Sequence, residues 1–144
     1  MAQRPDAIVV GGGIVGAACA RELARGGLNV TLIEADFIGG GATAAGMGHI
    51  VVMDDSPAQF ALTALSRSLL DDVAPDLPAA VERDRCGTLW VAEDEAQLDS
   101  AREKQTAYAA AGAEASLLDA EELSRLEPEL RPGLAGGMLV PGDG

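Results

Sequence analysis

Three glycines in the pattern Gly11-x-Gly13-x-x-Gly16 carry the clearest chemical signal in this sequence. They follow an apolar run at residues 7–10 and open a stretch with helical periodicity, which is the context that a dinucleotide fingerprint requires. Gly11 would permit a tight turn, Gly13 the approach of a diphosphate to the backbone, and Gly16 close packing of the helix on the strand. The free N–H groups at the helix start would attract the phosphates, so the pattern predicts a diphosphate site.

A carboxylate stands where such a site needs one. Glu34 ends a second β-branched run, residues 29–33, and follows Gly16 by 18 residues. At that position it would accept hydrogen bonds from the hydroxyls of an adenosine ribose and would repel a 2′-phosphate. A glycine triplet alone also fits a structural turn between strand and helix. Strand, glycine turn, helix, strand and acid together favour dinucleotide binding.

The other residues with chemical potential give weaker signals. His49, the only histidine, would either lie beside a cofactor and take a proton or be a hydrogen-bonded loop residue without chemistry. Asp54 and Asp55 form a carboxylate pair, but they precede a Ser-Pro helix start and we interpret them as helix-start acids. Cys19 and Cys86 have no partners at metal-ligand spacing. We expect no metal site, reduced thiols and a cytoplasmic protein.

The elements that position these residues begin as a βαβ unit. Residues 7–10 predict a buried strand, residues 14–25 a helix closed by Gly26 and Gly27, and residues 29–33 a parallel strand. A Gly/Ala-rich stretch at residues 39–48 then replaces the second helix of a wound sheet. Its helix propensity is poor, so we expect a loop. Such a loop can lie flat against a ring or a diphosphate, the alternative being an ordinary surface loop.

The rest of the chain has a different pattern of elements. Strands are expected at residues 50–53, 81–86, 88–92 and 136–140, and helices at 56–74, 94–111 and from Asp119, with Leu62, Leu65, Leu69 and Val73 as an apolar stripe of the first helix. The predicted fold class is α/β. A Rossmann-like βαβ unit in residues 1–78 precedes the start of a mixed-sheet substrate domain in residues 79–144.

Composition excludes several classes of function. Ten basic and 23 acidic residues give a net charge of −13, which disfavours binding to nucleic acid or to anionic membrane surfaces. A hydrophobic content of 48% argues against disorder. No secretory signal is visible, and no segment approaches the roughly 20 apolar residues that span a bilayer.

The chain also resembles a known family. The stretches AIVVGGGIVG (7–16), LIE (32–34) and GATAAGM (41–47) are similar to FAD-dependent amine and amino-acid oxidoreductases. This D-amino-acid oxidase-like family includes glycine oxidase, sarcosine oxidase and D-amino-acid dehydrogenase. Residues 86–92 and 126–144 look like the start of that family's substrate domain.

The resemblance implies FAD as cofactor and assigns it to particular residues. The diphosphate would contact Gly11, Gly13 and Gly16, and the adenosine ribose would contact Glu34. The diphosphate and ribityl region would meet Gly41, Ala42 and Thr43, and the isoalloxazine ring would lie along Ala44, Ala45, Gly46 and Met47. The cofactor would also contact Gly12, Ile14, Val15 and Ala35.

The resemblance also implies an activity. The enzyme would oxidise the CH–NH bond of a small amine or amino acid by hydride transfer to flavin. Because the family's second half is absent from the sequence, we expect an N-terminal portion that is inactive alone and needs its C-terminal half or a partner subunit. The alternatives are an NAD-linked dehydrogenase domain and a non-catalytic piece of a truncated or split flavoprotein.

Overall fold

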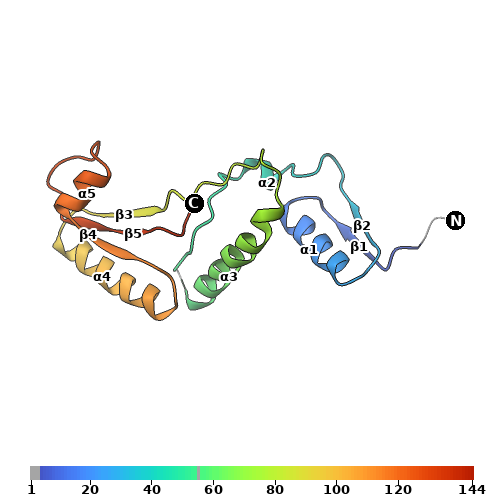
Figure 1. Ribbon diagram of the computed structural model, residues 1–144, viewed down its shortest axis with the longest axis horizontal. Coiled ribbons are helices and arrows are strands. Elements are labelled where there is room, and N and C mark those ends of the chain that lie inside the picture. The colour runs from blue at the N-terminus through green and yellow to red at the C-terminus, as the bar shows by residue number, and fades with distance from the viewer. Residues whose placement is uncertain (1–3, 55) are drawn as a thin grey trace. The chain divides into compact units, whose positions relative to one another are not determined.

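The computed structural model describes residues 4–54 and 56–144. Contacts within the chain divide it into two compact units, Met1–Gly48 and His49–Gly144, and each is described by itself (Figure 1). The expected boundary between a nucleotide-binding part and a second part, at residues 78 and 79, concerns function and stays a prediction.

Unit 1 is the predicted βαβ unit. β1 (Ala7–Val10) and β2 (Val30–Ile33) pair in parallel from Ala7↔Val30 to Val10↔Ile33, and α1 (Ile14–Arg25) connects them. Their β-branched residues suit a pleated, half-buried surface. Gly26 caps α1, and its N–H bonds the carbonyl of Glu22 at 3.0 Å.

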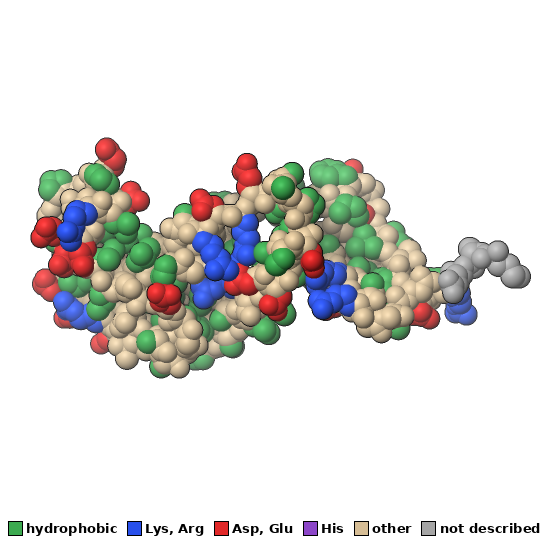
Figure 2. All heavy atoms as spheres, in the orientation of Figure 1, with side chains coloured by type: hydrophobic (Ala, Val, Ile, Leu, Met, Phe, Trp, Pro, Cys, Tyr) green, Lys and Arg blue, Asp and Glu red, His purple; other side chains and the backbone are tan. Residues whose placement is uncertain are grey.

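One face of this small sheet has no cover among the described residues of unit 1. The side chains of Ile8, Val10 and Ile33 are 58%, 83% and 48% exposed, and Figure 2 shows hydrophobic side chains on the visible surface of both units. Parallel strands are normally covered on both faces. Unit 1 therefore presents an apolar face that a complete wound sheet would bury.

Unit 2 combines helices with an antiparallel sheet. Its elements are α3 (Pro57–Val73), a 3₁₀ turn η1 (Ala74–Asp76), β3 (Thr88–Ala92), α4 (Glu95–Ala110), β4 (Ser116–Asp119), α5 (Ala120–Leu126) and β5 (Gly136–Val140). Within the described part of the chain the sheet order is β3-β5-β4, with β5 antiparallel to both neighbours. The fold class is α/β, as predicted.

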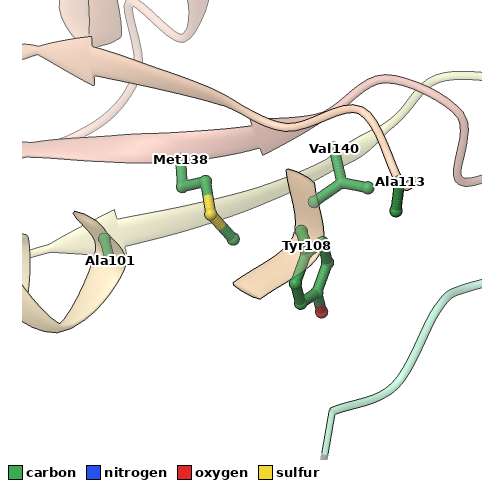
Figure 3. Close-up of a cluster of buried hydrophobic side chains, with 5 residues drawn as sticks. All are labelled: Ala101, Tyr108, Ala113, Met138 and Val140. Atoms are coloured by element: carbon green, nitrogen blue, oxygen red, sulfur yellow. The ribbon is translucent and has the colours of Figure 1, made fainter. Parts of the chain in front are cut away.

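The core of unit 2 lies between α4 and β5. Ala101 and Tyr108 from α4, Ala113, and Met138 and Val140 from β5 form one buried cluster (Figure 3). The Tyr108 ring meets Phe60 of α3 edge-on, with centroids 5.1 Å apart. Tyr108 is 1% exposed, and its hydroxyl donates to the carbonyl of Val52 at 3.2 Å.

Three expectations about secondary structure are wrong. Residues 81–86 form no strand; Arg83 and Arg85 bond Asp71 of α3, and the run finds side-chain partners instead of a neighbouring strand. Residues 50–53 are also not a strand. The stretch 39–48 is not wholly a loop, because Ala42–Ala45 form the short helix α2.

The leucine stripe of α3 is also uncovered. The helix itself is confirmed, with Ser56 as N-cap accepting from the Gln59 N–H at 3.2 Å. However, Leu62, Leu65 and Leu69 are 64%, 57% and 54% exposed. Each unit thus carries an apolar face with no partner among its own residues.

Candidate functional site

The glycine turn between β1 and α1 is built as the sequence predicts. Gly11 has a φ of +105°, which favours glycine, and its N–H donates to the carbonyl of Ile33 at 2.8 Å. A Cβ built on Gly16 would overlap the carbonyl oxygen of Gly11. The first turn of α1 therefore packs directly on the end of the strand, and only glycine fits there.

The start of α1 offers N–H groups that the protein leaves open. Gly13 is the N-cap and has no side-chain cap, and no acidic residue lies in the first turn. Among the described residues, the N–H groups of Val15 and Gly16 have no hydrogen-bond acceptor. Together with the helix dipole, these groups can bind an anion such as a phosphate.

Glu34 lies at the end of β2 with its carboxylate turned to the glycine turn. Its Oε2 accepts from the Gly12 N–H at 2.6 Å, and its Oε1 accepts from the N–H groups of Ala35 and Asp36 at 2.7 and 3.1 Å. The bond from Gly12, followed by those from Asp36 and Ala35, holds the pKa of Glu34 below its ordinary value. An ionised acceptor thus stands beside the turn.

The segment after β2 returns to the same turn. The Gly39 N–H donates to the carbonyl of Gly12 at 2.9 Å, and the Thr43 hydroxyl accepts from the Ile14 N–H at 3.0 Å. The structure therefore brings Glu34, Thr43 and the glycine turn together. Among the described residues, Thr43 is the one member of the predicted stretch 41–47 with a hydrogen bond to this region. Residues 41–47 are all exposed, with Met47 at 84%.

His49 belongs to unit 2. It lines an open pocket of about 490 Å³ together with residues 51–54, 86–90 and 143–144. Trp90 in this lining is 43% exposed, and the ammonium of Lys104 lies 4.1 Å from the centre of its ring. The pocket gives His49 access to solvent, and the geometry assigns it no chemical role.

The predicted acids and thiols do not gather into a site. Asp54 lies two residues before the N-cap Ser56 and pairs with Lys104 at 2.6 Å, and Asp55 lies outside the described residues. Cys19 and Cys86 are free and exposed. Over residues 4–54 and 56–144, no cluster of three or more His, Cys, Asp or Glu side chains could hold a metal ion. In the same residues no helix has the length and apolar character needed to cross a membrane.

The sequence analysis missed one buried carboxylate. Asp143 is 1% exposed, and its Oδ1 accepts from the Val52 N–H at 3.2 Å and from the Arg67 guanidinium at 2.7 Å. Residue 144 adds a pair of backbone bonds, because Ile50 and Gly144 exchange N–H···O contacts of 2.6 and 3.0 Å. A local sequence pattern cannot indicate the bond between Val52 and Asp143, because the two residues lie 91 positions apart along the chain.

Comparison with known proteins points to one family. Residues 6–144 match the sequence pattern of the family described as FAD dependent oxidoreductase. Glycine oxidase of Geobacillus kaustophilus is 31% identical over all of this chain, and a subunit of the anaerobic glycerol-3-phosphate dehydrogenase of Haemophilus influenzae is 28% identical over 94% of it.

Solved structures agree with this result. The fold matches that of the Geobacillus kaustophilus glycine oxidase with a TM-score of 0.81 and 30% identity, over 97% of this chain and 40% of that one. It matches L-proline dehydrogenase from P. horikoshii with a TM-score of 0.84 and 27% identity, over 100% of this chain and 38% of that one. Of the curated relatives named above, the chain spans 40% and 24% of the length.

Proposed function

Because the chain belongs to the FAD dependent oxidoreductase family, we propose that it forms the dinucleotide-binding end of an enzyme that oxidises a small amine or amino acid. The observation that carries the proposal is the start of α1. Open N–H groups, no acidic residue in the first turn of α1 and a glycine with no room for a side chain together make a cradle for a diphosphate.

The described residues fit this cofactor. The diphosphate would lie on the glycine turn and the first N–H groups of α1, and the adenosine ribose would meet Glu34 and Ala35. The small, exposed side chains of residues 41–47 would lie against the ribityl chain and the ring. The net charge of −13 makes this backbone-made attraction important, because the side chains as a whole repel phosphate. Residues 1–78 would serve the cofactor and 79–144 begin the substrate-binding part.

When bound, FAD would supply the acceptor for a hydride from the CH–NH carbon of the substrate. The chain's own residues would bind and orient the cofactor. Glu34 would hold the ribose and reject a 2′-phosphate. His49 stays a candidate for a position beside the flavin, on the ground that it follows residues 41–48 directly.

The substrate class rests on the relatives. Glycine oxidase and L-proline dehydrogenase are named for amino acids and match nearly the whole chain, whereas the glycerol-3-phosphate dehydrogenase subunit is the more distant of the two curated sequences. We therefore favour a CH–NH donor over a CH–OH donor. The free, exposed cysteines suit a reducing compartment, and we propose a cytoplasmic location.

We also propose that the active enzyme contains further folded structure, contributed by more of the same chain or by a partner subunit. Two apolar faces support this: that of Ile8, Val10 and Ile33 on the β1–β2 sheet, and the leucine stripe of α3. The relatives, of whose length this chain covers 40% or less, contain more structure than the two units.

The proposal is tested by cofactor binding to the chain as it stands. We expect the purified 144-residue protein to quench FAD fluorescence saturably and to prefer FAD to NAD⁺. Gly13→Val would abolish binding, because its side chain would occupy the approach of the diphosphate to the backbone. The matched control is Gly26→Val at the other end of α1, where φ is −71° and affinity should be retained. A folded wild-type chain that binds NAD⁺ but not FAD would overturn the assignment.

A further inference from the structure

The carboxylate of Glu34 makes a contact that the expected ribose site does not require. Two of its three hydrogen bonds are local, to the N–H groups of Ala35 and Asp36. The third crosses 22 residues to the N–H of Gly12, and at 2.6 Å it is the shortest of the three. Short bonds of this kind, with an ionised acceptor, are the stronger ones.

Gly12 depends on this contact. It is buried, so its N–H would have no partner if the carboxylate moved away, and an unpaired buried N–H is costly. Its carbonyl accepts from the Gly39 N–H at 2.9 Å. Both backbone groups of Gly12 are thus held by residues 34–39, and Ile38 encloses the same position closely.

We propose that Glu34 is a positioning residue for the glycine turn: its carboxylate holds the Gly12 N–H and so fixes the turn before any dinucleotide arrives. This role comes in addition to the ribose contact and rests on the proposed function for its use. Glu34 keeps capacity for both. Oε1 is occupied by two N–H groups, while Oε2 accepts one and has a second lone pair for a ribose hydroxyl.

The consequence is that one side chain couples the shape of the diphosphate cradle to recognition of the ribose. A turn that is already ordered costs less conformational entropy when the cofactor binds. Thr43 also helps to order the start of α1, because its hydroxyl accepts from the Ile14 N–H at 3.0 Å. Of Glu34 and Thr43, only Glu34 accepts a hydrogen bond from a residue within the glycine turn, namely Gly12.

The substitution that separates the roles is Glu34→Gln. An amide has a single acceptor oxygen; with that oxygen keeping the two N–H groups of Ala35 and Asp36, the NH₂ group faces the Gly12 N–H. A ribose hydroxyl can still bond an amide, whereas the Gly12 N–H facing NH₂ cannot. The matched control is Glu22→Gln on α1, which removes only exposed ion pairs with Arg21 and Arg25.

The first measurement is amide hydrogen exchange of the chain without nucleotide, so that no ribose contact contributes. We expect the Gly12 amide to exchange about tenfold faster in Glu34→Gln and at the wild-type rate in Glu22→Gln. An unchanged Gly12 rate in a folded Glu34→Gln protein would overturn the positioning role.

A second measurement needs no variant and stands if Glu34→Gln fails to fold. In a pH titration by NMR of the wild-type chain, the Gly12 amide shift should follow the Glu34 carboxyl carbon with the same midpoint. A Gly12 amide that does not move while Glu34 titrates would contradict the proposal. If the two titrate together in a chain that does not bind FAD, the proposed function fails and the positioning role stands.

Discussion

The removal of the Asp143 carboxylate gives the sharpest test of how unit 2 is held together. The carboxylate is 1% exposed and joins Arg67 of α3, whose side chain is 17% exposed, to the backbone of Val52. In Asp143→Ala the guanidinium loses its counter-charge and the Val52 N–H loses its acceptor. Both groups remain in the same low-dielectric surroundings.

The magnitude follows from these two losses. Breaking a buried ion pair by removing one partner costs about 3–5 kcal/mol, and leaving a buried donor without an acceptor costs about 1–3 kcal/mol. The two losses together would cost about 4–8 kcal/mol; because Arg67 keeps some exposure and can reach water, we expect the lower part of this range, about 4–5 kcal/mol. At a slope of about 1–3 kcal/mol per molar urea, the midpoint of unfolding shifts by more than about 1 M.

The assay uses the only tryptophan. Trp90 lies in β3, so its fluorescence during urea unfolding reports on unit 2. Asp143→Asn is the matched control, since its amide oxygen can still accept from Val52 and Arg67, and it should lose clearly less stability than the alanine variant. A variant already unfolded without urea also meets the expectation for alanine. A loss below about 1 kcal/mol for Asp143→Ala would refute the reasoning.

Three further predictions concern unit 1 and the apolar faces. Gly16→Ala should weaken FAD binding at least about tenfold in fluorescence titrations, because its Cβ would overlap the Gly11 carbonyl; unchanged affinity would count against the cradle. Glu34 has a folded pKa below its ordinary 4.5, so its bonds stabilise unit 1 above that pH and are lost as pH falls through the lower folded value. Urea unfolding followed by circular dichroism should therefore lose stability on acidification more steeply in the wild type than in Glu34→Gln, and parallel curves would refute this. Leu65→Gln should change the free energy of unfolding by no more than about 0.5 kcal/mol, since the side chain is 57% exposed; a larger loss in the same unfolding assay would mean that the chain covers it.

Elements whose signals are local could be predicted from the sequence. The βαβ unit follows from two β-branched runs around a glycine turn, and α1 spans Ile14–Arg25 as its periodicity and closing glycines indicate. The short helix after Asp119 is another case: the structure confirms a capping box in which Asp119 and Glu122 satisfy each other's N–H groups.

Elements that depend on distant partners could not be predicted from the sequence. Residues 50–53 have strand-like composition, but the N–H and C=O groups of Ile50 and Val52 are taken by Gly144, Asp143 and the Tyr108 hydroxyl. The sequence predicts a strand at residues 81–86 before Gly87, yet Arg83 and Arg85 pair with Asp71 instead. Composition within a short window cannot show such partners.

The same distinction applies to the candidate site. Sequence spacing predicted the tight turn at Gly11, the close packing at Gly16 and the position of Glu34 after the second strand, because the fingerprint is a local arrangement of strand, turn and helix. It did not indicate that the Glu34 carboxylate would also hold Gly12, or that Thr43 would hold Ile14 across 29 residues. Hydrogen bonds between segments require the folded backbone.

The hydrogen bond from the Val52 N–H to Asp143 affects the order in which native contacts can form while the chain is being synthesised. The contacts that shape unit 1 become available once the first 48 residues have left the ribosome. The Val52–Asp143 bond spans 91 residues, and at about 5–20 residues per second its second partner emerges roughly 5–20 s after the first. For that interval Arg67 and the Val52 N–H have no native partner. The nascent chain therefore carries the residues of unit 1 ahead of a second unit whose buried carboxylate contacts have not yet formed.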